Sequence, residues 1–192
     1  MRTCFFTSDL HLGHANIIRY AKRPFRDVDE MDEELVSRWN AVVLDGGATV
    51  YVVGDLSFHR PDTTARLLSR LRGKICWLLG NHDKPGRISG TMRERCEWVK
   101  EGLHTVQVPD ADARGGIQRI VLCHYAMRVW DKSHFGAWHL YGHSHGSLPD
   151  DPNSLSIDIG VDSHAYMPVS YEGVKRIMAR KVFKPIDHHG EA

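Results

Sequence analysis

The sequence predicts an α/β fold in which a core of two β-sheets is flanked by helices. Three observations indicate this class. Apolar segments of β-type composition recur along the chain, helical patterns lie between the early ones, and the later segments are mainly β. A chain of 192 residues is long enough to form one domain with its own core. We therefore expect a single domain over residues 1–186 and a loose C-terminal tail over residues 187–192.

Seven segments have the composition of strands. They are rich in Val, Ile, Phe, Trp and Tyr, and Gly, Asp or Asn bounds most of them. The expected strands are Thr3–Ser8, Thr49–Gly54, Lys74–Leu79, Thr105–Pro109, Gln118–His124, Trp138–Tyr141 and Ser154–Gly160.

Helices are expected where apolar residues recur every three or four positions after a start signal. Asp27 with Glu30 forms a capping-box pattern at one such start. Proline is favoured in the first turn of a helix, and Pro61 occupies that place in another. We expect helices to begin after Asp27, at Pro61 and after Ser170, and a further helix over residues 91–101.

The composition is that of an ordinary globular protein. The net charge of +1, from 25 basic and 24 acidic side chains, disfavours a dedicated nucleic-acid-binding protein but leaves a local basic patch open. No apolar run approaches the roughly 20 residues that a membrane helix needs, and the first residues lead directly into a strand rather than a signal peptide. The four cysteines form no C-x-x-C pair. We expect them to be reduced in a cytoplasmic protein without membrane contact.

Five short motifs are rich in the side chains that hold divalent metal ions, and each directly follows an apolar, β-like segment. Ligands of open α/β sheets collect at the carboxyl ends of strands, so these motifs are expected to lie together. They supply enough ligands for two metal ions and leave one histidine for proton transfer. The motifs are Asp9-Leu10-His11, Gly54-Asp55, Gly80-Asn81-His82-Asp83, His124 and Gly142-His143-Ser144-His145.

The spacing within the motifs suits metal binding. Asp9 and His11 are two residues apart, so in an extended chain both side chains point to the same side. His143 and His145 share that spacing. A carboxylate such as Asp55 can use both oxygens and bridge two ions. Taken singly, each of these motifs also fits a turn or a surface loop, and only their joint occurrence at strand ends favours the metal site.

The segment Gly80-Asn81-His82-Asp83 is the most specific of the five. Asn81 offers a neutral amide oxygen to a metal ion. His82 is then available as a proton donor, with Asp83 placed to hold its orientation. His124 is less informative alone, because a histidine that ends an apolar strand is more often a satisfied core residue than a ligand.

Together these residues resemble the calcineurin-like metallophosphoesterase superfamily, and the resemblance extends over essentially the whole chain. It implies a four-layer α/β/β/α sandwich of two mixed β-sheets flanked by helices, with His82 as the catalytic histidine beside Asp83. It further implies one metal ion held by Asp9, His11, Asp55 and His145, and a second held by Asp55, Asn81, His124 and His143.

The chain also resembles a narrower group of small bacterial and phage phosphoesterases. That likeness lies in Ser8–His14, Arg23-Pro24-Phe25, Ser133-His134-Phe135-Gly136 and Asp158–Asp162. Two other groups of the superfamily fit less well. The residues after Asp55 differ from the Asp-Arg-Gly pattern of serine/threonine protein phosphatases, and His82 replaces the arginine of the lipid A precursor hydrolases.

The expected function is hydrolysis of a small phosphate ester, with nucleotides among the candidates, by a metal-bridging hydroxide and by His82 as general acid. The two divalent ions could be Mn, Fe, Zn or Ni, because mixed nitrogen and oxygen ligands suit several metals. The sequence does not choose between a phosphodiesterase and a phosphatase. Candidate substrate-binding residues are Arg128, Trp130, His134 and His14. For the first three, a position in an ordinary surface loop is an equal alternative. For His14, the equal alternative is contact with a metal ligand rather than with the substrate.

Two other functions remain open at this point. Repair nucleases of the Mre11 type use the same motif set, and steep salt dependence of DNA binding would favour that reading. The related retromer subunit is a noncatalytic scaffold that lacks the catalytic histidine, which is present in this chain. The sequence indicates neither an oligomeric state nor a protein partner.

Overall fold

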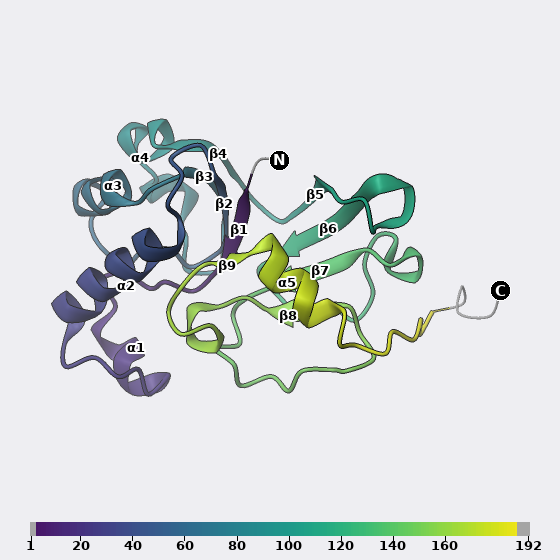
Figure 1. Ribbon diagram of the computed structural model, residues 1–192. Coiled ribbons are helices and arrows are strands. Elements are labelled where there is room, and N and C mark those ends of the chain that lie inside the picture. The colour runs from purple at the N-terminus through teal and green to yellow at the C-terminus, as the bar shows by residue number, and fades with distance from the viewer. Residues whose placement is uncertain (1–2, 188–192) are drawn as a thin grey trace.

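The computed structural model describes residues 3–187, which fold into two mixed β-sheets with helices packed around them (Figure 1). The first sheet has the order β4-β3-β2-β1-β9, and the second has the order β5-β6-β7-β8. The expected α/β class with a two-sheet core is therefore confirmed. The strands are β1 Cys4–Thr7, β2 Thr49–Val53, β3 Lys74–Leu78, β4 Cys96–Lys100, β5 Leu103–Pro109, β6 Ile117–Cys123, β7 Trp138–Tyr141, β8 Ser156–Asp158 and β9 Val169–Ser170.

All seven predicted strands are present, with ends that differ by at most two residues. The expected helix over residues 91–101 is wrong for most of its length. Only Gly90–Glu94 is helical (α4), and Cys96–Lys100 forms strand β4, which pairs in parallel with β3. Hydrogen bonding to β3 at the edge of the sheet, together with the alternation of apolar and polar residues around Trp98, outweighs the weak helical pattern there.

The other predicted helices begin where their capping residues stand. The Asp27 carboxylate accepts the backbone N–H of Glu30 at 2.9 Å, and the Ser170 hydroxyl accepts that of Gly173 at 3.1 Å. One short helix, Ala15–Tyr20 (α1), was not predicted. The remaining helices are α2 Val28–Val42, α3 Pro61–Arg70 and α5 Tyr171–Met178, with short 3₁₀ helices η1 Pro85–Arg87, η2 Arg114–Gly116, η3 Ser133–Phe135 and η4 Val161–Ser163.

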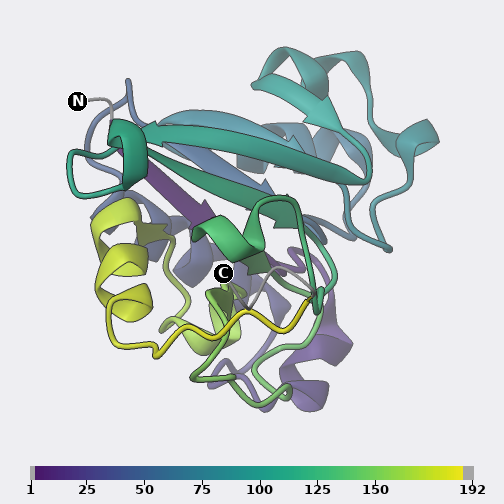
Figure 2. The same ribbon diagram turned by 90° about the vertical axis from the view of Figure 1, so that its right-hand side faces the viewer.

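The core lies in layers. Helices α2, α3 and α4 lie on the outer side of the first sheet, with α1 beside α2 (Figure 1). Fully buried side chains such as Trp39 and Trp77 pack in this layer. A second cluster fills the space between the two sheets and includes residues of α5. On the outer face of the second sheet, Trp130 and Ala137 pack on Val121, so the segment that carries η3 covers that sheet (Figure 2).

Three further observations bear on the sequence-based expectations. No helix within residues 3–187 is both long and apolar enough to cross a membrane. The four cysteines all lie among the described residues, and none forms a disulfide bond. The expected tail falls, apart from Asp187, outside the described residues.

Candidate metal centre

The five motifs meet where the carboxyl ends of the strands from both sheets face each other. Strands β1, β2 and β3 are parallel, so the residues that follow them emerge at one edge of the first sheet. Strands β6 and β7 are also parallel and deliver their motifs from the second sheet. Backbone hydrogen bonds link neighbouring motifs, including Asp9 N–H to Gly54 O at 3.0 Å and Gly142 N–H to His124 O at 3.0 Å.

Two glycines allow this close approach of backbone segments. Gly54 has φ of 97°, and a Cβ atom there would collide with the His124 ring. A Cβ atom on Gly142 would collide with Ser8 and with the Asp9 carboxylate. Any side chain at either position would therefore push a predicted ligand out of place.

Five of the predicted metal ligands have left-handed backbone conformations, which non-glycine residues rarely adopt. Such conformations cost free energy and persist where the surrounding structure holds them, most often at functional sites. The strain therefore coincides with the predicted site. The φ values are 57° for Asp9, 54° for His11, 53° for Asp55, 66° for His143 and 48° for His145.

The first ligand group contains Asp9, His11 and His145, whose donor atoms lie within 4.8 Å of one another. Asp9 Oδ1 and His11 Nε2 are 3.8 Å apart. Both atoms are buried and neither has a hydrogen-bond partner. Buried polar atoms are normally satisfied, so two unsatisfied atoms facing the same point fit a cation between them.

The second group contains Asp9, Asp55 and His124, and Asp55 lies between the two groups. Its Oδ2 atom is 3.6 Å from His11 Nε2 and 3.4 Å from His124 Nε2. A carboxylate in this position can serve both groups. Asn81 Oδ1 joins this side of the site at 2.9 Å from His124 Nε2 and 3.0 Å from His143 Nδ1. The structure thus brings all seven predicted ligands together.

Three histidines of the site have one ring nitrogen occupied by a protein partner. His124 Nδ1 lies 2.9 Å from the carbonyl oxygen of Val53 and must donate to it. In the neutral form of the ring, Nε2 then carries the lone pair that a metal ion would bind. His11 Nδ1 meets His14 Nδ1 at 3.1 Å, and His145 Nδ1 meets the Asp162 carboxylate at 2.8 Å. Such partners fix the ring orientation and tautomer of metal-binding histidines.

Arg23 and Asp162 support the site and were not predicted as functional residues. The Arg23 guanidinium is buried and forms a bidentate pair with Asp162, with both N···O distances at 2.8 Å. Two further N–H groups donate to the backbone carbonyls of Asp9 at 2.7 Å and Leu10 at 2.9 Å. One side chain therefore fixes both the β1 turn and the carboxylate that orients His145. Both residues lie in segments whose resemblance to phage phosphoesterases was noted, but their pairing spans 139 positions of sequence.

The charges of the site are strongly coupled. Burial opposes ionisation of Asp55, but hydrogen bonding and charge from His124, with the His82 N–H, hold its pKa below the usual range. Burial also opposes protonation of His124, yet Asp55 and Asp9 raise the pKa of this histidine to about 8. For His11, burial dominates and lowers the pKa. The Asp55 carboxyl is thus ionised near neutral pH, and a proton on His124 would compete with a metal ion for this ring.

Asp83 has a different role from the one expected. Its carboxylate accepts N–H groups from Gly80, Asp55, Leu56 and the Trp77 indole at 2.7–3.1 Å. No hydrogen bond between Asp83 and the His82 ring occurs among the described residues. Asp83 therefore holds the turn that carries Asp55, and the prediction that it orients His82 is corrected.

His82 lies at the rim of the site and is exposed, unlike the buried ligands Asp9, His11, Asp55 and His124. Its Nε2 atom is 4.0 Å from Asp55 Oδ2, while its backbone N–H donates to Asp55 Oδ1 at 2.9 Å. The ring packs beside Phe58 with centroids 5.0 Å apart. This position lets the imidazole face a molecule entering from solvent.

The predicted substrate-binding residues divide into two groups. His14 is near the site and stacks on Phe58 with ring centroids 4.1 Å apart. Trp130 is buried, and its indole N–H donates to Ala137 O at 2.9 Å, so its prediction as a stacking residue is corrected to a packing role. Arg128 is exposed and lines a separate cavity of about 320 Å³ that contains none of the predicted ligands. His134 lies 3.9 Å from Asp187, which lines the same cavity as Arg128.

Tyr125 is a rim residue to which the sequence analysis assigned no role. Its side chain is 48% exposed, and its ring centroid is 4.7 Å from that of His143. Its position directly after His124 was the available signal, since it places the ring at the mouth of the site. With Phe58 and His14, it gives the rim an aromatic character.

Fold and site define an α/β sandwich protein with a candidate metal centre between the ends of its two sheets. No protein-family model matches the chain. The uncharacterized protein MJ1445 of Methanocaldococcus jannaschii is 31% identical over 195 residues, which cover 97% of this chain and 98% of that protein. The chain therefore belongs to the family of this archaeal protein.

Phage and bacterial proteins are also similar. The Gene 66 protein of Mycobacterium phage L5 is 27% identical over 184 residues, covering 85% of this chain and 88% of that protein. The crystal structure of AQ665, a protein of unknown function from Aquifex aeolicus, superposes with a TM-score of 0.67 at 20% identity. That match covers 92% of this chain and 100% of the other, and it shows a shared fold.

Proposed function

We propose that the protein is a metal-dependent phosphoesterase of the calcineurin-like superfamily that uses two divalent ions. The observation that carries the proposal is the pair of unsatisfied buried atoms, Asp9 Oδ1 and His11 Nε2, facing Asp55 between two donor groups. Burying unpaired polar atoms costs free energy unless a ligand compensates them. Mixed carboxylate, imidazole and amide donors suit divalent transition metals.

The residues divide between two ions as the superfamily resemblance implies. Asp9, His11 and His145 would hold one ion, and Asn81, His124 and His143 the other, with Asp55 shared. Bound divalent ions would lower the pKa of bound water and neutralise phosphoryl oxygens. The two carboxylates leave part of the charge of two dications uncompensated, which attracts an anionic ester.

His82 would protonate the leaving oxygen of the ester. Its ring is exposed at the rim, while its backbone N–H fixes the Asp55 carboxylate at 2.9 Å. The side chain can therefore reach an incoming substrate without giving up a hydrogen bond to a ligand. Phe58 packs against this ring and limits its orientations.

The substrate would be a small phosphate ester, with a nucleotide as the leading candidate. His14, Phe58 and Tyr125 line the rim with rings on which a base or sugar can pack. This part of the proposal is tested by comparing nucleotides with simple esters.

The test begins with metal-stripped protein to which Mn²⁺, Ni²⁺, Zn²⁺ or Fe²⁺ is returned singly. Metal content is measured by elemental analysis, and hydrolysis is measured with bis-p-nitrophenyl phosphate, p-nitrophenyl phosphate and nucleotides. We expect about two ions per chain and activity that Asp55→Asn abolishes. The preferred ester distinguishes a diesterase from a monoesterase.

Protein that binds two ions but hydrolyses none of these esters would contradict the enzymatic proposal and favour a binding role. Protein that binds no metal would contradict the whole proposal.

A further inference from the structure

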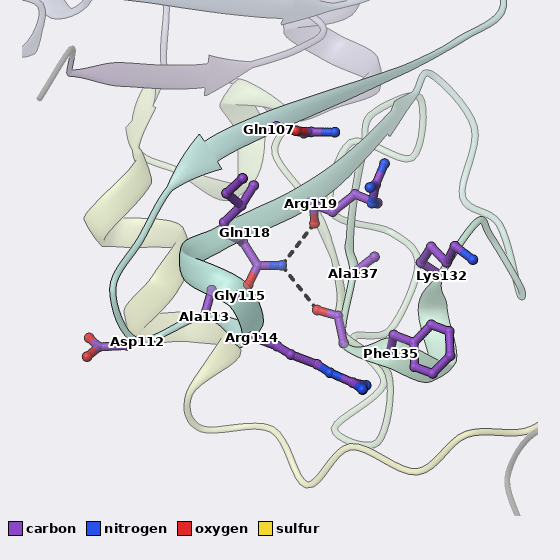
Figure 3. A pocket seen from close by; sticks show the side chains of 12 residues that line it. Gln107, Asp112, Ala113, Arg114, Gly115, Gln118, Arg119, Lys132, Phe135 and Ala137 are labelled. Atoms are coloured by element: carbon purple, nitrogen blue, oxygen red, sulfur yellow. Dashed lines mark hydrogen bonds between the residues drawn. The ribbon is translucent and has the colours of Figure 1, made fainter.

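A second candidate binding site lies at the other end of the second sheet. A cavity of about 680 Å³ opens there, between the start of β6, the turn that carries η2, and the segment that carries η3 (Figure 3). None of the predicted metal ligands lines it. Strand β6 leads from Ile117 in this cavity to the metal ligand His124, a separation of about 20 Å at the usual rise of a strand.

The walls of this cavity are held in place by hydrogen bonds. The Gln118 side-chain amide donates to Arg119 O at 2.9 Å and to Gly136 O at 3.1 Å (Figure 3). The first bond fixes the amide group on β6, and the second ties the η3 segment to that strand. The cavity is therefore part of the folded structure rather than a gap between loose loops.

Three cationic side chains line the cavity without a carboxylate partner. Arg114, Arg119 and Lys132 form no salt bridge to any residue within 3–187. The one acidic side chain in the lining, Asp112, is bound to Lys175 at 2.7 Å. Uncompensated cations in a concave surface attract anions, and guanidinium groups suit phosphate oxygens in particular.

Apolar groups are exposed among these cations. Phe135 is 52% exposed and Ile117 is 47% exposed. The Phe135 ring centroid lies 5.1 Å from Arg114 Cζ and 5.4 Å from Lys132 Nζ. Both cations lie over this ring, so positive charge and exposed apolar surface adjoin each other in the cavity wall.

We propose that this pocket binds a phosphorylated compound with a planar aromatic ring, which is the chemistry of a nucleoside monophosphate. Arg119 and the neighbouring cations of the cavity wall would attract the phosphate, and the ring would lie against the exposed apolar wall of Phe135 and Ile117. The cavity volume falls in the range of about 300–1,000 Å³ that is usual for small-ligand sites. Because the pocket is separate from the metal centre, binding there requires no metal ion.

Calorimetric titration of metal-stripped protein with adenosine monophosphate tests the proposal. We expect adenosine monophosphate to bind, and adenosine or inorganic phosphate alone to bind more weakly. In NMR spectra, the nucleotide should shift the backbone amide signals of Gly115, Gly116 and Gly136. Loss of one charge-assisted contact in Arg119→Ala should weaken binding about tenfold or more. The matched control is Arg66→Ala, which removes an exposed arginine of α3 that forms no salt bridge among the described residues.

The ring contact and the source of the ligand are tested separately. Phe135→Ala should weaken binding of adenosine monophosphate but not that of inorganic phosphate. A short 5′-phosphorylated DNA strand that binds more tightly than the free nucleotide, with the same dependence on Arg119, would identify a strand end as the source. The proposal is overturned if the nucleotide does not bind, if Arg66→Ala weakens binding as much as Arg119→Ala, or if the shifts occur at Gly80 and Gly142 instead.

Discussion

Arg23 links the turn after β1 to the carboxylate that orients His145 in the candidate metal centre. Its guanidinium bonds to the carbonyls of Asp9 and Leu10 and to the Asp162 carboxylate, which in turn accepts a bond from His145. All of these contacts lie within 2.7–2.9 Å. The burial that opposes ionisation of Asp162 is outweighed by His145 and Arg23, so the pKa of this carboxyl is lowered. It is thus an ionised partner for His145.

Removing this support should weaken metal binding without removing a ligand. We expect Asp162→Ala to lower metal affinity about 10- to 100-fold, since partners of metal-bound histidines contribute on that scale. Asp162→Asn keeps a hydrogen-bond acceptor for His145, so its metal affinity should fall less than that of Asp162→Ala. Calorimetric titration with Zn²⁺ measures the effect, and Arg26→Ala, at an exposed pair with Asp27, is the control. Equal affinities in Asp162→Ala and wild-type protein would remove Asp162 from the metal centre.

His82 is the residue at which catalysis and metal binding should separate. The side chain of His82 is exposed, and neither group of candidate metal ligands around Asp9 contains it. The His82→Ala variant should therefore retain its metal ions. General acid catalysis contributes about 10²–10⁴-fold, so kcat for a poor leaving group should fall by that factor. Steady-state kinetics and elemental analysis of the same sample measure both quantities. Loss of metal in His82→Ala would instead make this histidine a ligand.

Trp130 should behave as a core residue and not as a substrate contact. Its side chain is 8% exposed and packs with Val121 and Ala137. Truncation of a buried Trp typically costs about 3–5 kcal/mol of unfolding free energy, so Trp130→Ala should be strongly destabilised in urea titration. Trp130→Phe should lose less unfolding free energy than Trp130→Ala, and both variants should keep the wild-type affinity for metal. A variant of normal stability that binds the ester poorly would restore the substrate-binding role.

At the scale of elements, a buried carboxylate fastens α5 to the end of β5. Asp110 accepts a bond from the Tyr171 hydroxyl and one from Lys175 Nζ at 2.7 Å. Lys175 and Tyr171 are the main causes that lower the pKa of Asp110 to about 2. Since the native pKa lies below that of the unfolded chain, near 4, the contribution to stability is complete above about pH 4. It is lost as the pH falls through about 2.

This linkage predicts a specific acid sensitivity. Asp110→Asn should lose about 1 kcal/mol of unfolding free energy at pH 5, after allowance for solvent screening. It should also lose less stability than wild-type protein between pH 4 and pH 2. Urea titrations at several pH values measure both effects. Asp112→Asn, at the more exposed partner of Lys175, should reproduce neither of them, and an unchanged acid slope in Asp110→Asn would contradict the assignment.

Elements whose patterns are local could be predicted, and those set by distant contacts could not. The apolar runs and capping residues identified seven strands and three helices, because their composition alone favours those structures. Strand β4 was mistaken for a helix because its pairing with β3 decides its conformation. The same limit applies at the site. Ligand types and spacing predicted the convergence of the motifs, but the role of Asp83 depends on N–H groups 27 and 28 positions away.

At the scale of the whole molecule, the candidate metal ligands come from both sheets. Asp9, Asp55 and Asn81 follow strands of the first sheet, while His124, His143 and His145 follow strands of the second. Ions held between them would act as cross-links between layers that otherwise meet through apolar packing. The strained backbone at five of the seven predicted ligands also means that the native structure meets a conformational cost that binding would offset.

Metal removal should therefore lower global stability and loosen both sheets together. A ligand present at 100 times its Kd stabilises the native state by about 2.7 kcal/mol. For a chain of this length that corresponds to about 5–10 °C in Tm. We expect a rise of this size when Zn²⁺ is added to stripped wild-type protein, measured by calorimetry, and none in Asp9→Asn. Hydrogen exchange of the ends of β1, β2, β6 and β7 should slow at the same time. If exchange slows in only one sheet, the ions do not bridge the layers. If Asp9→Asn gains the same Tm, the stabilising ion binds elsewhere.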